Sequence, residues 1–144
     1  MTASSAADPG AAAARLLADH DDAWVSALTD ELDRQLRAHR LERIMRLWGL
    51  SRTELGAMFG VSRQAVSKWL AHGVPPDRVV VVADVDAITD LLDRYLRRER
   101  IAAVVRRPAP RLGGRSLIEL IAAGGSAEAL DLTRQMFAFS DVHA

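Results

Sequence analysis

Residues 51–70 read SRTELGAMFGVSRQAVSKWL, and this stretch decides how the chain folds. Ser51, followed three residues later by Glu54, forms a capping box and predicts the start of a helix. Gly60 predicts the end of that helix, because glycine readily takes the left-handed conformation that a sharp turn requires. Ser62 then caps a second helix. The stretch therefore predicts two short helices joined by a tight turn.

Apolar residues at helical spacing mark the inward faces of the two predicted helices. The inward positions are Leu55, Met58, Phe59, Val66, Trp69 and Leu70, with Val61 in the turn between them. The outward positions of the second helix are Arg63, Gln64, Ser67 and Lys68. All four outward side chains can donate hydrogen bonds.

Outward side chains of this kind fit the edges of base pairs in a major groove. Arg can donate two hydrogen bonds to guanine, Gln can form two hydrogen bonds with adenine, and Ser and Lys can reach bases or phosphates. We therefore predict sequence-specific binding to double-stranded operator DNA through Arg52, Ser62, Arg63, Gln64, Ser67 and Lys68. The alternative is that the two helices are surface elements of a plain helical bundle.

The segment resembles the helix-turn-helix of the Cro and Xre-type repressor family. That pattern has a small residue in the first helix, here Gly56, and a glycine in the turn, here Gly60. One recognition helix reads only a few base pairs, so repressors present two such helices about 34 Å apart. We therefore expect a homodimer.

The charge of the chain alternates in sign along the sequence, although its net value is zero. Residues 34–78 hold nine Lys and Arg against three acids, and residues 94–115 hold eight Arg against one Glu. The first basic block coincides with the predicted DNA-binding helices, as attraction to phosphate requires. Solvated helix faces explain part of the pattern. Four i,i+4 pairs of opposite charge are expected there: Asp30–Arg34, Asp33–Arg37, Asp90–Arg94 and Asp93–Arg97.

The composition excludes several classes of protein. The chain has no cysteine and its four histidines lack partners at metal-ligand spacing, so we expect no zinc finger, disulfide scaffold or bound metal. We find no nucleophile with a base and no phosphate loop, and therefore expect neither an enzyme nor a cofactor. A signal peptide and a run of about eighteen apolar residues are both missing, which predicts a cytoplasmic protein without a membrane partner.

The remaining sequence is helical in nearly every window. It predicts an all-α fold, in which a helix-turn-helix bundle is followed by a small C-terminal helical domain. We expect residues 1–20 to form a disordered lead and residues 21–98 to form an N-terminal helix plus the DNA-binding domain. Residues 99–144 are expected to form the small second domain.

Further helices flank the predicted turn. Before it, helical periodicity begins near Asp21 and continues to Trp48, after which Gly49 ends the helix. After it, the β-branched run at residues 79–82 favours a strand. Apolar positions over residues 81–95 nevertheless repeat at steps of four and three, which predicts a helix. Its apolar stripe is either core or a dimer seam, and its aspartates are expected on the solvated face.

The C-terminal part contains a second capping box, Ser116 with Glu119, after a turn rich in Pro and Gly. Gly124 or Gly125 ends the helix that this box begins. Ser126 opens a last helix, whose expected inward residues are Leu130, Met136 and either Phe137 or Phe139.

This part resembles the toxin-binding domain of the Xre/MbcA/ParS-like antitoxin family, which follows an Xre-type helix-turn-helix. The matching positions are Pro108, Pro110, the turn at residues 112–115, the helix at residues 117–121 and the loop at Gly124. The resemblance implies an antitoxin of a type II toxin-antitoxin system. Such a protein represses its own operon and neutralises a cognate toxin, often an NAD-consuming RES-domain protein. It further implies toxin contacts from Arg111, Leu112, Gly113, Gly114, Arg115, Phe137 and Phe139.

Three functions compete at this point. The first is an antitoxin that is also an autorepressor. The second is a solitary helix-turn-helix transcriptional regulator without a toxin partner, and a toxin gene beside this one would separate the two. The third is an adaptor that binds no DNA and uses its basic blocks to hold an acidic protein.

Overall fold

The computed structural model describes residues 8–142, with side chains through residue 138. The regular structure of this part is helical and contains no strand, so the predicted all-α fold is confirmed. None of the described helices is long and apolar enough to cross a membrane. The elements are α1 (Pro9–Asp19), α2 (Asp22–Trp48), α3 (Arg52–Phe59), α4 (Arg63–His72), η1 (Pro76–Arg78), α5 (Val79–Tyr95), α6 (Arg98–Val104), η2 (Pro110–Leu112), α7 (Leu117–Ala122) and α8 (Ser126–Val142).

Residues 8–36 belong to the first of two compact units, and none of their side chains is buried. The structure differs here from the expected disordered lead over residues 1–20, because residues 9–19 form α1. Asp8 caps α1 by accepting a hydrogen bond from the backbone nitrogen of Ala11 at 2.9 Å, and an alanine-rich stretch with high helix propensity follows. Residues 1–7 lie outside the described part.

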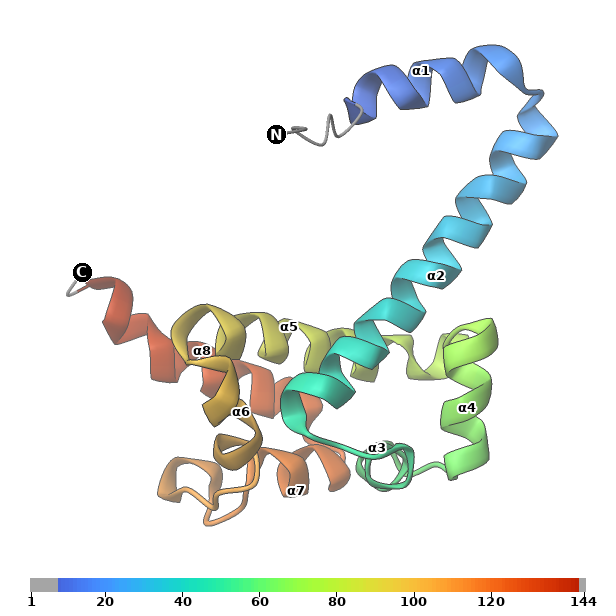
Figure 1. The fold of residues 1–144 in the computed structure, drawn as a ribbon. Coiled ribbons are helices and arrows are strands. Elements are labelled where there is room, and N and C mark those ends of the chain that lie inside the picture. The colour runs from blue at the N-terminus through green and yellow to red at the C-terminus, as the bar shows by residue number, and fades with distance from the viewer. Residues whose placement is uncertain (1–7, 143–144) are drawn as a thin grey trace. The chain divides into compact units, whose positions relative to one another are not determined.

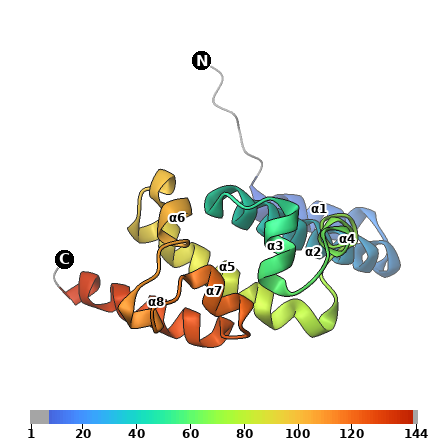
Figure 2. The same ribbon diagram turned by 90° about the horizontal axis from the view of Figure 1, so that it is seen from below.

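Residues 37–142 build the second compact unit around one hydrophobic core. In this unit α5 lies beside α8, and α3 contacts both α4 and α7 (Figure 1; Figure 2 gives the view from below). The core therefore draws on elements from both ends of the unit. Its largest fully buried side chains are Leu41, Ile44, Trp48, Leu55, Met58, Ile88, Leu92, Ile101 and Leu117.

The helices on either side of the predicted turn form as expected. α2 runs without interruption to Trp48, and Gly49 follows with a φ of 64°. The β-branched run at residues 79–82 is the first turn of α5 and not a strand, because its helical periodicity places Val82, Val85 and later apolar residues in the core.

Arg106 joins the end of α2 to the C-terminal helices. Its guanidinium donates hydrogen bonds to the carbonyl oxygen of Trp48 at 2.5 Å and to that of Gly49 at 2.7 Å. Carbonyls at a helix C-terminus lack helical partners, and a cation there also complements the helix dipole. Residues on both sides of position 98 therefore share a core and a helix cap, and a division into two domains at that position stays a prediction.

Candidate nucleic-acid interface

The turn between α3 and α4 has capped helices on both sides. Ser51 and Glu54 exchange two hydrogen bonds, from each backbone nitrogen to the other side chain, at 3.2 and 3.1 Å. The hydrogen bond from the Ser51 backbone also lowers the pKa of Glu54. α3 ends at Gly60, whose φ of 69° is left-handed, and Ser62 caps α4 by accepting from the nitrogen of Ala65 at 3.1 Å. The predicted caps and turn glycine are thus confirmed.

Gly56 lets the backbone of the turn lie directly against α3. A Cβ atom at this position would stand 2.6 Å from the carbonyl oxygen of Val61, a distance that real Cβ contacts do not show. The backbone nitrogen of Val61 also donates a hydrogen bond to the Gly56 carbonyl at 2.8 Å. Close backbone approach, and not local conformation, therefore accounts for glycine in the middle of this helix.

α4 has one buried face and one exposed face. Val66 and Trp69 are buried in the core, which fixes the rotation of the helix about its axis. Arg63, Gln64 and Lys68 are exposed on the other side, and no hydrogen bond or ion pair with another described residue engages them. Their donors are therefore available to a ligand that lies along α4.

Two further predicted DNA contacts are linked to each other. The guanidinium of Arg52, at the start of α3, donates a hydrogen bond to the hydroxyl of Ser67 on α4 at 3.0 Å. The pair leaves further guanidinium donors of Arg52 unused. Ser62 uses its hydroxyl oxygen as the cap of α4. Its hydroxyl proton can still be donated to a phosphate, while one of the two lone pairs of the oxygen is used by the cap.

Arg78 is a residue that sequence reasoning did not single out. Its guanidinium donates a hydrogen bond to the carbonyl oxygen of Phe59, in the last turn of α3, at 2.8 Å. This bond satisfies a carbonyl that the helix leaves without a partner. Because the two residues are 19 positions apart, no local pattern predicts their contact.

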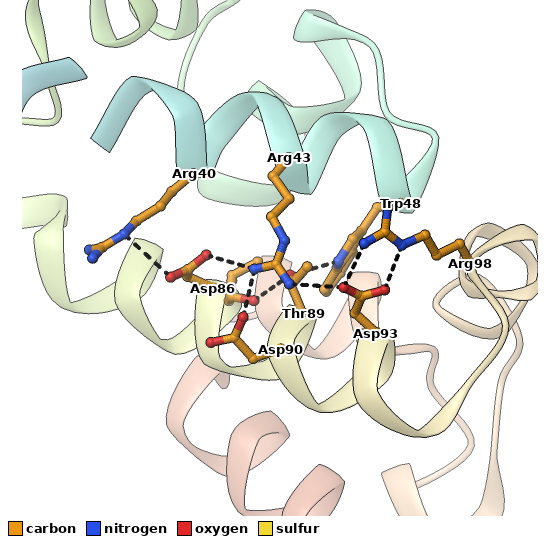
Figure 3. Close-up of polar contacts among 9 residues, drawn as sticks. Arg40, Arg43, Trp48, Asp86, Thr89, Asp90, Asp93 and Arg98 are labelled. Atoms are coloured by element: carbon orange, nitrogen blue, oxygen red, sulfur yellow. Dashed lines mark hydrogen bonds and ion pairs between the residues drawn. The ribbon is translucent and has the colours of Figure 1, made fainter. Parts of the chain in front are cut away.

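A network of ion pairs fastens α2 to α5 (Figure 3). Arg43 of α2 donates to Asp90 at 2.6 Å and to Asp93 at 3.4 Å. Arg98 donates to Asp93 at 2.8 Å, and this hydrogen bond lowers the pKa of the carboxyl group. α3 follows α2 after only three residues. The network therefore helps to hold the helices that carry the candidate DNA contacts.

Two expectations from the sequence about charged residues are wrong. None of the four predicted i,i+4 pairs forms an ion pair within the described chain. Three of the residues have other partners: Arg34 pairs with Glu31, and Asp90 and Asp93 pair with Arg43. Nor do the aspartates of α5 simply face solvent, since the side chain of Asp93 is only 19 % exposed.

Asp86 is a largely buried carboxylate between α2 and α5. Its nearest cations, Arg40 and Arg43, stand 3.7 Å away, and one carboxylate oxygen accepts no hydrogen bond from the described residues. Burial, reinforced by the nearby charge of Asp90, raises the pKa of Asp86. The network therefore contains one carboxylate that its surroundings do not fully satisfy.

The predicted toxin contacts divide into exposed and buried side chains. Arg111, Gly113, Gly114 and Arg115 are exposed in the turn after α6, which an isolated bridge between Ala109 and Arg115 closes. Leu112 is only 6 % exposed and belongs to the core, so its side chain is not available to a partner.

The two predicted aromatic contacts lie on α8. Phe137 is half-buried and stacks on Tyr95, with ring centroids 4.7 Å apart. The side chain of Phe139 lies outside the described part of the chain. Beside this helix, a groove of about 480 Å³ is lined by Arg111, Leu132, Gln135 and Ala138.

The described residues contain no group of three or more His, Cys, Asp or Glu side chains placed to hold a metal ion. The free polar groups of the described residues include the donors on α4 and the exposed arginines of the C-terminal turn. No known family model, curated protein or solved structure matches the chain. Both family resemblances stay predictions that rest on the residues quoted above.

Proposed function

We propose that this protein is a DNA-binding antitoxin, which represses its own operon and neutralises a cognate toxin in the cytoplasm. The observation that carries the DNA-binding half is the exposed face of α4. Arg63, Gln64 and Lys68 stand free on that face, while the opposite face is fixed in the core. A rigid helix with free donors along one side is what major-groove recognition requires.

The residues on and around α4 have different roles in this proposal. Arg63 and Gln64, at the start of α4, contact base edges, because residues near the N-terminus of a recognition helix point into the groove. Lys68, Arg52 and the hydroxyl proton of Ser62 contact phosphates and position the helix. The N-terminus of α4 adds a favourable partial positive charge near the phosphates.

The toxin-binding half rests on the family resemblance and on exposed groups at the C-terminal turn. Arg111 and Arg115 present free guanidinium groups, and Arg111 also lines the groove beside α8. These features support an interface with an acidic surface of a partner. The burial of Leu112 removes one expected contact and favours the second candidate, a solitary transcriptional regulator that uses the same DNA contacts.

Co-expression separates the two candidates. The full chain, tagged, is produced with the products of its neighbouring genes, and copurifying proteins are identified by mass spectrometry. An antitoxin brings down a stoichiometric partner that is toxic when expressed alone. The double variant Arg111→Glu with Arg115→Glu should release that partner, whereas Arg63→Ala should retain it. Recovery of the chain alone, still able to retard DNA from its own promoter, identifies a solitary regulator.

Binding to promoter DNA tests the half that both candidates share. The full chain should bind DNA from upstream of its own gene more tightly than random DNA, with an affinity that falls steeply as salt rises. Equal affinity for both DNAs, or no binding at low salt, contradicts both candidates. The basic blocks would then belong to an adaptor for an acidic protein.

A further inference from the structure

The second basic block of the chain, residues 94–115, holds eight Arg against one Glu. Three of these arginines have partners within the chain: Arg98 pairs with an aspartate of α5, Arg106 caps the end of α2, and Arg94 lies over an aromatic ring. Two more belong to the C-terminal turn that is proposed to meet a toxin. The remaining three are exposed, and no described residue engages them in a hydrogen bond or an ion pair: Arg97, Arg100 and Arg107.

These three arginines lie on the outward side of α6 and of the turn that follows it. The inward side is fixed in the core, where Ile101 and Val105 are completely buried. The backbone nitrogens of residues 106 and 107 donate to carbonyls three positions earlier, so the helical winding continues past the end of α6. Positions 100, 103 and 107 therefore share one side, and position 97 lies at its edge. We call this side the α6 face, and its exposed residues are Arg97, Arg100, Ala103 and Arg107.

The α6 face carries charge but has no apolar centre. Its uncharged member is Ala103, and the exposed large hydrophobic side chains in the described part of this compact unit lie elsewhere, at the start of α5. A protein interface draws most of its affinity from aromatic or aliphatic side chains that become buried at its centre. Contacts to phosphates need only charged donors. The chemistry of the face therefore suits a nucleic-acid backbone better than a protein.

The spacing along the α6 face also suits a duplex. Arg100 and Arg107 are seven positions apart, which corresponds to about 10 Å along a helix. Double-stranded DNA carries one negative charge per about 1.7 Å of its axis, so each guanidinium meets a different phosphate. Glu99 is the single acid of residues 94–115, so this part of the chain offers little repulsion to DNA.

The α6 face is separate from the proposed operator contacts. Those contacts centre on α4, and α3 lies between α4 and α6 in both views of the fold (Figure 1; Figure 2). The α6 face therefore does not reach the stretch of groove that α4 would read. The backbone available to it belongs either to DNA that flanks the operator or to a second duplex.

We infer that the α6 face binds the phosphate backbone of double-stranded DNA outside the stretch that α4 contacts. This binding is independent of sequence, because phosphates carry no direct information about the bases. It gives a local site for DNA to a chain whose net charge is zero. The inference does not require recognition of an operator by α4, and in that respect it goes beyond the proposed function.

The salt dependence of binding to random double-stranded DNA tests the inference. Fluorescence anisotropy of the full chain measures log affinity against log salt. Changing Arg97, Arg100 and Arg107 together to Ser should reduce this slope by about 2 to 3, since each phosphate contact contributes about 0.9. Changing the same three residues to Lys should keep most of the slope, because a lysine still contacts phosphate.

A control with the same change of net charge separates a local contact from a general effect of charge. Arg15, Arg37 and Arg134 are exposed at other places in the chain. Changing these three together to Ser should leave the slope nearly unchanged. Circular dichroism establishes that each triple variant stays folded. An unchanged slope in the α6-face Ser variant overturns the inference, and if that variant also releases a copurifying protein, the face belongs to an acidic partner.

A variant of α4 distinguishes failure of this inference from failure of the proposed function. With Arg63, Gln64 and Lys68 changed to Ala, the chain should lose its preference for promoter DNA but still bind random DNA through the α6 face. No affinity for random DNA in this variant overturns the inference and leaves recognition by α4 in place. A wild type that binds both DNAs equally contradicts the proposed function and leaves the inference in place.

A tethered cleavage reagent shows which duplex the α6 face meets. The chain has no cysteine, so an iron chelate attached through Ala103→Cys cuts the DNA backbone near this face alone. Cuts in the flanks of promoter DNA identify the operator duplex, and cuts in an added random duplex identify a second one. Ala127→Cys, at an exposed position of α8, is the matched control and should cut neither. The absence of cuts from position 103 in both duplexes overturns the inference.

Discussion

The indole nitrogen of Trp48 donates a hydrogen bond to the hydroxyl of Thr89 at 2.9 Å, and both residues are completely buried. The bond joins the last residue of α2 to the middle of α5. Thr89 in turn donates to the carbonyl of Val85 at 2.7 Å, one turn earlier in its own helix. A buried indole N–H needs an acceptor, and within the described core Thr89 supplies it.

Replacing Thr89 with Val should destabilise the fold by about 1 to 3 kcal/mol, because it leaves the Trp48 donor buried without a partner. Thr133→Val is the matched control. Thr133 is equally buried, but its hydroxyl is described only as donating to a carbonyl of its own helix, at 2.7 Å. Loss of that hydroxyl therefore leaves no other donor without a partner. Urea unfolding followed by tryptophan fluorescence measures both variants. Equal losses would contradict a special role for the Trp48 bond.

Changing Arg63 and Gln64 together to Ala should reduce the discrimination between operator and random DNA by roughly 2 to 5 kcal/mol. Both side chains are exposed and contact no described partner, so thermal stability should not change. Fluorescence anisotropy with the two DNAs measures the effect. Lys68→Ala is the comparison, since loss of a phosphate contact weakens both complexes alike. A uniform loss in the double variant would place Arg63 and Gln64 on phosphates.

Gly56→Ala should destabilise the protein more than Gly60→Ala. A Cβ at Gly56 would meet the backbone oxygen of Val61 at 2.6 Å, and overpacking of this kind costs about 1 to 3 kcal/mol. A Cβ at Gly60 enters open space and brings only the strain of a left-handed φ, about 1 to 2 kcal/mol. Chemical denaturation gives both values. The reverse order would mean that α3 can shift away from the turn.

Two aspartates of α5 should respond oppositely to conversion to Asn. Burial raises the pKa of Asp86, so the folded state prefers its neutral form, and its ionisation costs stability as the pH rises through the folded pKa. Asp86→Asn should therefore raise the free energy of unfolding at neutral pH. The gain should disappear below about pH 4, where Asp86 itself is protonated.

For Asp93 the sign is the reverse. The hydrogen bond from Arg98, helped by Arg43, lowers the pKa of Asp93, so its contribution to stability is present above the ordinary pKa and lost as the pH falls through the folded one. Asp93→Asn should therefore destabilise at neutral pH and lose its effect in acid. Thermal unfolding of both variants between about pH 3 and pH 7 measures this. A parallel response would mean that the two carboxylates share one environment.

A chain that ends at Arg97 should not fold cooperatively. The truncation removes α8 from the side of α5, α7 from α3, and the Arg106 cap from the end of α2. Circular dichroism during urea titration measures cooperativity, and binding of promoter DNA measures function. A sharp transition with retained DNA binding would support the predicted domain boundary between residues 98 and 99.

The elements that could be predicted from the sequence are those that depend on residues close together in the chain. The capping box of Ser51 and Glu54, the cap at Ser116, the turn glycine and the helical period of residues 79–95 each depend on residues a few positions apart, and the structure confirms them. The second predicted capping box forms only in part, because Ser116 accepts from the backbone nitrogen of Glu119 without a return bond from the Glu119 side chain. The sequence pattern predicts only that a small residue is needed at Gly56. The physical cause is the carbonyl oxygen of Val61, whose position is known only from the folded turn.

The contacts that could not be read join residues far apart in the chain. Arg43 with Asp90, Arg78 with the Phe59 carbonyl and Arg106 with the end of α2 each depend on how the helices pack. Counting charges along the sequence places these arginines in the basic blocks. It cannot distinguish the arginines that hold helices together from the arginines that have no partner within the chain. Leu112 shows the same limit, because its place in a turn motif does not reveal its burial.

The packing of α8 on α5 has a consequence for how the protein is made. Chains leave the ribosome N-terminus first, and segments fold when their packing partners have emerged. α3 and α4 are among the early segments, but the core beneath them is completed by residues as late as Leu130. The helices that are proposed to meet DNA thus reach their final stability only after the first half of α8 has been synthesised. A message interrupted before α8 then yields fragments in which α3 and α4 are not held by the complete core.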